Sequence, residues 1–385
     1  MIKIITVIGA RPQFIKAAAI SRAIRTSYAD RVKEVIVHTG QHYDRDMSEV
    51  FFEQLEIPRE DYNLGIGSGS HGVQTSGIIV ALEEVMIKEM PDAVILYGDT
   101  NSTLAGAVVA SKLRVPIIHI EAGMRSFTKE VPEEINRIMC DHVSTLLFTP
   151  TQTGAENLYA EGFKRDNVGP YHVDNPKVIP CGDIMYDNSL YFKDVAIANS
   201  DILGKVGVNK DAYVLVTIHR NNNTDDTDRL RDIFETLDRL SEVNQTPFVI
   251  PLHPRTRKML GSMSDLEARI SANKNLHIIP PASYLDMICL EANAEMVVTD
   301  SGGVQKEAYY FEKPCVILQG ETPWVELVSN GCAELVDADP NRIEAAFYYF
   351  RKNRNTLRYA PVFGDGNAAE FTIAKILEYL PFNKA

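Results

Sequence analysis

The sequence predicts an α/β protein with two Rossmann-like domains, each built on a parallel sheet. Three observations predict this fold class. The chain has 385 residues, which is more than one ordinary core organises. Apolar, β-branched runs alternate with helical patterns, which is typical of a parallel sheet covered by helices on both faces. The alternation restarts after a less regular stretch around residues 164–177, so the second half repeats the architecture of the first.

Strands and helices follow one another in order through both halves. In the first half, strands are predicted at residues 2–8, 33–39, 93–97 and 116–120, with helices at 14–25, 104–113 and from Pro132, which suits a first helical position. In the second half, strands are predicted at 212–217, 247–252, 276–279, 294–299 and 314–318, with a helix at 225–240. Ligands of open parallel sheets bind beyond the carboxyl ends of the strands. We therefore expect polar residues that follow the strands of both halves to face one cleft.

The composition argues against several classes of function. The formal net charge of -13 opposes binding to nucleic acids and anionic membranes, although a small anionic substrate can bind in a local basic site. The five cysteines are scattered singly, which argues against a disulfide framework and a zinc site. The apolar N-terminal run is too short for a signal peptide, and no run approaches the ~20 residues of a membrane span. We expect a cytoplasmic protein without a metal.

The sharpest local pattern is the segment 299–307, where an apolar strand is followed by Ser301, Gly302 and Gly303 and then by a helix. Glycines let a ligand approach the backbone, and the N–H groups of a helix N-terminus attract a diphosphate. Glu307, one turn further, is placed to accept hydrogen bonds from ribose hydroxyls. The alternative is a tight turn with Ser301 as an ordinary N-cap. No G-x-G-x-x-G pattern follows a strand, so NAD is not indicated and no cofactor is expected.

Basic side chains follow strands in both halves. Arg11 and Lys16 come after the first strand and can reach an anion at the next helix, unless they are simply solvated. His219 and Arg220 follow the strand 212–217, and His253 follows the strand 247–252. A lone histidine is usually structural, but a histidine beside an arginine at such a position is a candidate for contact with a leaving diphosphate.

Three carboxylates occur at strand ends, or at the start of the next helix, in the first half. Asp99 and Glu121 each end a strand, and Glu133 begins the helix that starts at Pro132. Glu133 and Arg137 also lie one turn apart, so a plain ion pair is the alternative there. Several acids in one site allow a proton to be removed from one face of a substrate carbon and returned to the other.

Taken together, these residues resemble the non-hydrolysing UDP-N-acetylglucosamine 2-epimerase family over nearly the whole chain. The resemblance is carried by segments at residues 9–16, 98–103, 119–125, 132–137, 301–307 and 364–366. It implies the GT-B fold, with an N-terminal domain at 1–185, a UDP-binding domain at 186–364 and a C-terminal helix at 365–385 that packs back on the first domain. It also implies a role in cell-surface polysaccharide synthesis. Exposed apolar helix faces separately suggest a homodimer.

The resemblance implies a mechanism of elimination and re-addition on a UDP-2-acetamido sugar. The C2 proton and UDP leave, and UDP then adds back while the proton returns to the opposite face. Family acid and base groups match Asp99, Glu121 and Glu133, and the histidine near the leaving diphosphate matches His219. Nucleotide contacts match Arg11, Lys16, Arg137, Ser301, Gly302 and Glu307. The residues themselves add Arg220, His253 and Gly303 as candidates.

Some segments depart from the family pattern. Trp324-Val325-Glu326 replaces Arg-Pro-Glu, and the sequence from Gln41 to Asp44 departs from the segment that helps form an activator pocket. These variants resemble the branch that acts on UDP-2,3-diacetamido-glucuronate, whose carboxylate Arg125, Lys129 or Arg255 is placed to pair with. Both sugars stay open. A GT-B glycosyltransferase and a hydrolysing 2-epimerase are the alternative functions.

Overall fold

The chain forms two compact α/β units in the computed structural model, which describes residues 1–40 and 58–380. The first unit comprises residues 1–188 and the chain from 361 onward, and the second comprises residues 189–360. Each unit contains one sheet in which every pairing is parallel. The predicted fold class of two parallel-sheet α/β domains is therefore confirmed. The segment from Gln41 to Asp44 lies outside the described residues.

The sheet of the first unit has the strand order β3-β2-β1-β4-β5-β6-β7. Its strands are β1 (Ile2–Ile8), β2 (Val32–His38), β3 (Tyr62–Asn63), β4 (Ala93–Tyr97), β5 (Ile117–Ile120), β6 (Leu146–Thr149) and β7 (Lys177–Pro180). All residues of β4, β5 and β6 are buried, because helices cover both faces of the sheet. This explains why these strands are continuous apolar runs rather than alternating ones.

Short connections lead from these strands into the helices of the first unit. The helices are α1 (Arg11–Ser27), α3 (His71–Glu89), α4 (Asn101–Leu113), α5 (Pro132–Val143), α6 (Gln152–Ala160), the start of α7 (Ile184–Asn199), and α17 (Ala368–Tyr379). Two helix starts follow from local chemistry. The Thr100 hydroxyl accepts a hydrogen bond from the Thr103 N–H and caps α4, and Pro132 begins α5.

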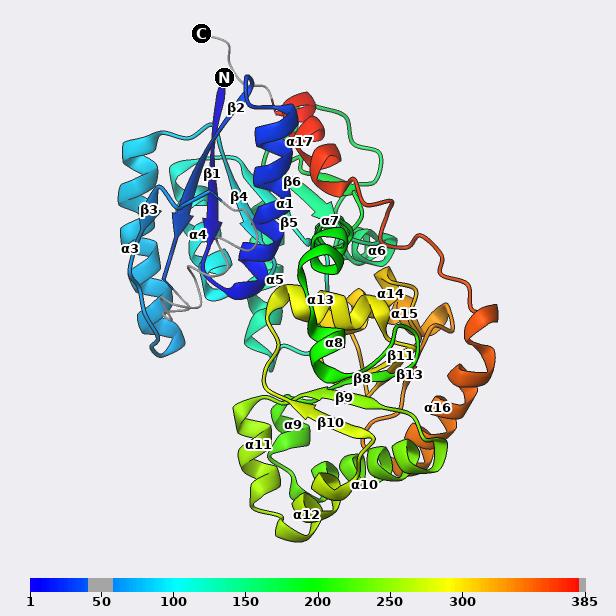
Figure 1. The fold of residues 1–385 in the computed structure, drawn as a ribbon. Coiled ribbons are helices and arrows are strands. Elements are labelled where there is room, and N and C mark those ends of the chain that lie inside the picture. The colour runs from blue at the N-terminus through cyan, green and yellow to red at the C-terminus, as the bar shows by residue number, and fades with distance from the viewer. Residues whose placement is uncertain (41–57, 381–385) are drawn as a thin grey trace. The chain divides into compact units, whose positions relative to one another are not determined.

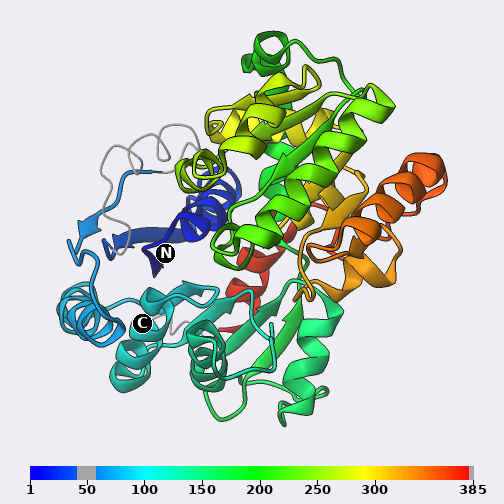
Figure 2. The same cartoon turned by 90° about the horizontal axis from the view of Figure 1, so that it is seen from below.

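The sheet of the second unit has the strand order β10-β9-β8-β11-β12-β13. Its strands are β8 (Val214–Thr217), β9 (Phe248–Pro251), β10 (Leu276–Ile279), β11 (Met296–Thr299), β12 (Cys315–Ile317) and β13 (Ala333–Leu335). Its helices, coloured green to orange, flank the sheet in both views (Figures 1 and 2). They are α8 (Ile202–Val206), α9 (Asn221–Thr224), α10 (Thr227–Asn244), α11 (Pro254–Gly261), α12 (Ser264–Ala272), α13 (Tyr284–Asn293), α14 (Gly302–Tyr310), α15 (Val325–Ser329) and α16 (Pro340–Asn353).

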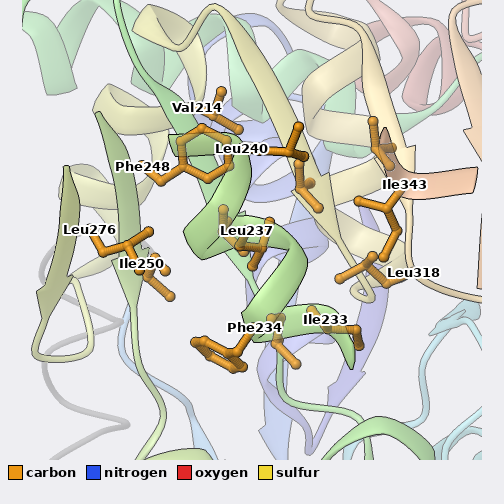
Figure 3. Close-up of a cluster of buried hydrophobic side chains, with 14 of the residues drawn as sticks. Val214, Ile233, Phe234, Leu237, Leu240, Phe248, Ile250, Leu276, Leu318 and Ile343 are labelled. Atoms are coloured by element: carbon orange, nitrogen blue, oxygen red, sulfur yellow. The ribbon is translucent and has the colours of Figure 1, made fainter. Parts of the chain in front are cut away.

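One large hydrophobic cluster forms the core on the α10 side of the second sheet. Figure 3 shows Phe234 and Leu237 of α10 packed among the strands, with Phe248 and Ile250 contributed by β9. Ile343 of α16 belongs to the same cluster. Complete burial of such side chains contributes about 1.5–3 kcal/mol each. Among the described residues, no helix is both long and apolar enough to cross a membrane.

Strand order determines where a ligand can bind in each unit. In the first sheet the chain moves outward from β1 to β2 and β3, then returns to the other side of β1 with β4. In the second sheet the same reversal occurs between β8 and β11. Loops that leave the two strands at such a reversal diverge and open a crevice at the carboxyl ends. A ligand is therefore expected to bind at the segments after β1 and β4 in the first unit, and after β8 and β11 in the second.

A buried carboxylate holds the C-terminal helix on the first unit. Asp187, in the first turn of α7, accepts hydrogen bonds from the N–H groups of Ala368 (3.1 Å) and Ala369 (2.7 Å) at the start of α17. These groups have no partner within their own helix. Ser27 of α1 also donates a hydrogen bond to Glu370, 2.8 Å away, and Figure 1 shows α17 beside α1.

We predict that Asp187 makes the stability of the protein depend on pH. Burial raises the pKa of Asp187 to about 6, although the two N–H groups lower it. Between the unfolded pKa, near 4, and about 6, the folded state binds more protons than the unfolded state. The contribution of this group to stability is therefore present below pH 4 and lost as the pH rises through 6, by on the order of 3 kcal/mol.

Denaturant unfolding of the wild type and of Asp187→Asn between pH 4 and pH 7 measures this effect. The wild type should lose stability relative to the variant as the pH rises across this window. A difference between the two proteins that stays constant with pH would contradict the assignment.

Candidate functional site

Two carboxylates and two cations gather at the carboxyl ends of β4 and β5. Asp99 follows β4 and forms an ion pair with Arg137 of α5. Glu121 follows β5 and forms an ion pair with Lys16 of α1. Their side chains are 24% and 16% exposed, so each carboxylate is held by a cation and still reaches solvent. The structure thus brings together four of the residues that the sequence predicted for this unit.

Gly98 shows how closely the two ion pairs approach each other. A Cβ atom placed on Gly98 would lie 3.3 Å from Lys16 Nζ and 3.8 Å from Glu121 Oε1, directly beside Asp99. Burial is the main reason that the pKa of Asp99 is raised, and Glu121 adds to this while Arg137 and Lys16 oppose it. A carboxyl group whose pKa is raised is suited to exchange a proton with a substrate.

The backbone at Glu121 adopts an unusual conformation. Glu121 has φ +70°, in the left-handed region that residues with a Cβ rarely adopt. Such conformations cost about 1–3 kcal/mol and persist only where the surrounding structure imposes them. Here the strained turn directs the Glu121 side chain back toward Gly98 and Lys16.

The two acids that begin α5 occupy different environments. Glu133 is exposed, and among the described residues it forms no hydrogen bond or ion pair with the other predicted acids. Arg137 pairs with Glu134, 3.1 Å away, and with Asp99, so the plain Glu133–Arg137 pair that the spacing allowed does not form. Glu134 is buried and accepts hydrogen bonds from the N–H groups of Ser126 and Phe127. Those bonds lower its pKa even though burial raises it.

The turn after β1 is held by a glutamine to which the sequence pattern gave no role. Gln13 is buried, and its side-chain oxygen accepts hydrogen bonds from the N–H groups of Gly9 and Ala10. Its amide donates to the carbonyl oxygen of Tyr97 at 2.9 Å. This side chain therefore ties the turn after β1 to the end of β4. Arg11 is the first residue of α1, and its side chain lies outside what the structure describes.

In the second unit, Asp300 organises the segments that follow β8 and β11. It is 0% exposed and accepts hydrogen bonds from the N–H groups of His219 and Arg220 and from the Asn223 amide, at 3.0 to 3.2 Å. His219 Nδ1 lies 3.1 Å from Asp300 Oδ1. Burial raises the pKa of Asp300, but these hydrogen bonds outweigh burial and lower it. An ionised Asp300 makes Nδ1 the proton donor and leaves Nε2 of the half-exposed His219 to face solvent.

The glycine loop lies next to this histidine segment. Ser301 caps α14 by accepting a hydrogen bond from the Val304 N–H. A Cβ atom placed on Gly302 would lie 3.6 Å from Arg220 Nη2 and 3.7 Å from Trp324 Nε1. A Cβ atom on Gly303 would lie 4.0 Å from Glu307 Oε2. The N-terminus of α14 is therefore surrounded by a guanidinium, an indole N–H and a carboxylate, which suits a ligand with a phosphate and hydroxyl groups.

Trp324 is also held in place by a buried cation. The Lys306 ammonium lies 4.0 Å from the centroid of the Trp324 ring, and both residues are buried. Thr322 links the same segment to α14, because its hydroxyl donates to the side-chain oxygen of Gln305. In the sequence, Trp324 stands out only as a departure from the family pattern. Its place beside Gly302 makes it part of the candidate site.

Other predicted residues already have partners within the protein. His253 is exposed and caps α11 by accepting a hydrogen bond from the Arg255 N–H. Arg255 forms an ion pair with Asp225. The sequence allowed Arg125, Lys129 or Arg255 to pair with a substrate carboxylate. The Arg125 side chain is 1% exposed and already forms ion pairs with Asp141 and Glu161.

The two units offer different chemistry. The first unit presents paired carboxylates and cations at the switch between β1 and β4, which suits proton transfer. The second presents a helix N-terminus, an arginine and an oriented histidine at the switch between β8 and β11, which suits an anionic leaving group. Among the described residues, no group of three or more His, Cys, Asp or Glu side chains is arranged to hold a metal ion.

Comparisons with known proteins match the chain to one family. The model of the family described as UDP-N-acetylglucosamine 2-epimerase matches residues 25–378. The chain is 45% identical over 379 residues to a UDP-N-acetylglucosamine 2-epimerase homolog of Methanococcus maripaludis, across 98% of this chain and 99% of that one. It is 48% identical over 336 residues to the UDP-2,3-diacetamido-2,3-dideoxy-D-glucuronate 2-epimerase of Pseudomonas aeruginosa, across 87% and 88% of the two chains.

A solved structure extends the match to the fold. The UDP-GlcNAc 2-epimerase of Methanocaldococcus jannaschii, in complex with UDP-GlcNAc and UDP, has a TM-score of 0.82 and 38% identity to this chain. The match covers 98% of this chain and 99% of that one. By sequence and by fold, the chain belongs to the UDP-N-acetylglucosamine 2-epimerase family.

Proposed function

We propose that the protein is a non-hydrolysing epimerase that inverts C2 of a UDP-2-acetamido sugar in the cytoplasm. The observation that carries the proposal is the pairing of Asp99 with Arg137 and of Glu121 with Lys16 around Gly98. Inversion of a carbon requires a proton to leave one face and return to the other, so two acid or base groups must be available. The carboxylates of Asp99 and Glu121 supply them.

In this proposal the second unit binds UDP and assists its departure. The hydrogen at C2 of such a sugar is not acidic, so a carboxylate alone cannot remove it at a useful rate. The C1–O bond to UDP must break at the same time, and cations and N–H groups must stabilise the released diphosphate. Arg220, the start of α14 and the outward Nε2 of His219 meet this requirement.

The reaction then balances without any other reactant. Proton loss from C2 and departure of UDP from C1 leave a double bond between the two carbons. UDP adds back to C1, and a proton is delivered to C2 on the opposite face. Neither step needs an oxidant, a reductant or water, so we propose no cofactor. Glu133 stays a third proposed acid on the basis of the family resemblance alone.

We predict that the protein transfers solvent deuterium to C2 of its substrate. Incubation in D₂O with UDP-GlcNAc, and separately with UDP-2,3-diacetamido-glucuronate, should give the C2 epimer of one of them, with deuterium at C2 and UDP still attached, by NMR. Asp99→Asn and Glu121→Gln should each lower turnover by about 10²–10⁴-fold, as expected for loss of a general acid or base.

The outcomes of this experiment separate the alternatives. A glycosyltransferase would leave C2 without deuterium in the absence of an acceptor, and a hydrolysing epimerase would release the free sugar. Full activity of either variant would remove that acid from the mechanism. Glu133→Gln provides the same test for the exposed acid of α5.

We predict that Gly302→Ala weakens binding of UDP without affecting folding. The added Cβ atom meets Arg220 and Trp324 only at ordinary contact distances, so the folded chain tolerates it. The methyl group would nevertheless occupy the space through which a phosphate approaches the N-terminus of α14. Trp324 is the one tryptophan of the chain, so a titration followed by intrinsic fluorescence reports on this loop.

Gly261→Ala, in α11 of the same unit, is the matched control, because a Cβ atom there meets only Glu267, at 3.9 Å. The wild type and this control should respond equally to UDP. Equal affinity of the Gly302 variant would exclude the loop as the phosphate site.

We propose that the protein is a homodimer that associates through α3. Val73, Val80 and Ile87 lie seven residues apart on one face of this helix, and they are 69%, 62% and 60% exposed. The helix α5, which packs against α4 as α3 does, also exposes apolar side chains, at Ile135 and Met139. Apolar side chains that recur on one helix face and remain exposed are typical of an interface.

The double variant Val73→Glu with Val80→Glu should therefore be a monomer by light scattering after gel filtration, because the charges would be buried in the interface. Val243→Glu is the matched control, since Val243 of α10 is likewise 69% exposed and lies in the second unit. A monomeric wild type, or a double variant that remains dimeric, would exclude α3 as the interface.

A further inference from the structure

His119 is a completely buried histidine that the proposed reaction does not use. It is the third residue of β5, and its side chain is 0% exposed. Nδ1 lies 2.6 Å from Asp141 Oδ1, and Nε2 lies 2.8 Å from the carbonyl oxygen of Gly98. Both partners are acceptors, so both ring nitrogens must donate and the ring is an imidazolium. Burial lowers the pKa of His119, but its neighbours Cys140 and Asp141 raise it well above its ordinary value.

The Asp141 carboxylate joins His119 to the turn after β5, which contains Glu121. Besides His119, it accepts a hydrogen bond from the N–H of Gly123 at 3.2 Å and forms an ion pair with Arg125 at 2.8 Å. Gly123 has φ +76°, and a Cβ atom there would lie 2.1 Å from the carbonyl oxygen of Gly154, so this turn packs directly against the backbone of α6. The buried pair of His119 and Asp141 therefore forms hydrogen bonds to Gly98, just before Asp99, and to Gly123, in the turn that contains Glu121.

Gly98 also occupies a constrained position. It has φ +59°, and the backbone that follows it carries Asp99 into the cluster of acids and cations. Asn136 of α5 donates a hydrogen bond to the carbonyl oxygen of Asp99 at 2.8 Å. The peptide groups on both sides of the Asp99 Cα are thus fixed by buried polar side chains, one from β5 and one from α5.

We infer that His119 is a positioning residue, whose Nε2–H bond to the Gly98 carbonyl holds Asp99 in the orientation that proton transfer requires. This inference rests on the proposed function, since it assigns to Asp99 a role in the reaction. An imidazolium serves this purpose because both of its ring nitrogens donate hydrogen bonds. Nδ1 donates to the Asp141 carboxylate of α5, and Nε2 donates to the Gly98 carbonyl after β4. Removal of the bond to Gly98 leaves the rest of the site in place but frees the turn that orients Asp99.

Two substitutions separate the bond to Gly98 from the bond to Asp141. In His119→Gln the terminal amide nitrogen occupies roughly the position of Nε2, so it can still donate to the Gly98 carbonyl. In His119→Asn the amide nitrogen occupies roughly the position of Nδ1, so it can still donate to Asp141 but cannot reach Gly98. Both variants lose the imidazolium charge, which makes each the control for the other.

The experiment measures kcat from deuterium incorporation at C2, UDP affinity from Trp324 fluorescence, and the midpoint of thermal unfolding. We expect His119→Asn to lower kcat by about 10²-fold, the cost of a small misplacement of a reacting group, without a change in UDP affinity. We expect His119→Gln to retain clearly more turnover than His119→Asn, even though it breaks the bond to Asp141.

Leu82→Ala, in the core of the first unit, tests whether a loss of stability alone lowers turnover. It should lower the midpoint of thermal unfolding while kcat stays unchanged. Equal turnover of the Gln and Asn variants, or loss of turnover in proportion to loss of stability, would overturn the inference. A wild-type enzyme that incorporates no deuterium would instead overturn the proposed function.

Discussion

A fully buried aspartate fixes the loops of the candidate site in each unit, and the rest of the site depends on it. Asp141 and Asp300 are both 0% exposed. A buried carboxylate without partners is very costly, so each must be surrounded by donors. Those donors are the N–H groups and side chains of the turns that follow the strands. The hydrogen bonds that stabilise each buried carboxylate therefore also fix the geometry of these turns. If a turn moved, the carboxylate would lose its donors inside an apolar interior.

The same arrangement yields opposite chemistry in the two units because the turns carry different side chains. Around Asp141, the constrained turns present the carboxylates of Asp99 and Glu121, with Lys16 and Arg137 as their counter-ions. Around Asp300, the turns present backbone N–H groups, a guanidinium and an imidazole. A negative net charge of the whole chain is compatible with this, because a local cluster of donors determines what an anion meets at short range.

Much of this architecture was predictable from the sequence, because buried parallel strands are continuous apolar runs. The strands at 93–97 and 276–279 were predicted with their observed ends, and α5 with its observed start. The strands β6, β7 and β13 were not predicted. They have three or four residues, as several predicted strands also do, and a run this short is an ambiguous signal for a strand. The acids of the site were predicted by their position after strands, but their partners were not, since pairing depends on contacts distant in sequence.

The helix α5 shows why pattern alone could not have completed the site. Its buried face carries Glu134 and Asp141, whereas Ile135 and Met139 are more than 40% exposed. A helix read by its apolar residues would be rotated so that these acids face solvent, and the anchor of the first-unit site would be lost. A helix with acids on its buried face and apolar residues on its exposed face is stable once both faces have partners. Buried donors satisfy the acids, and we propose that a second copy of the chain covers the apolar residues. In this proposal, the polarity of α5 reflects the candidate site on one face and dimer assembly on the other.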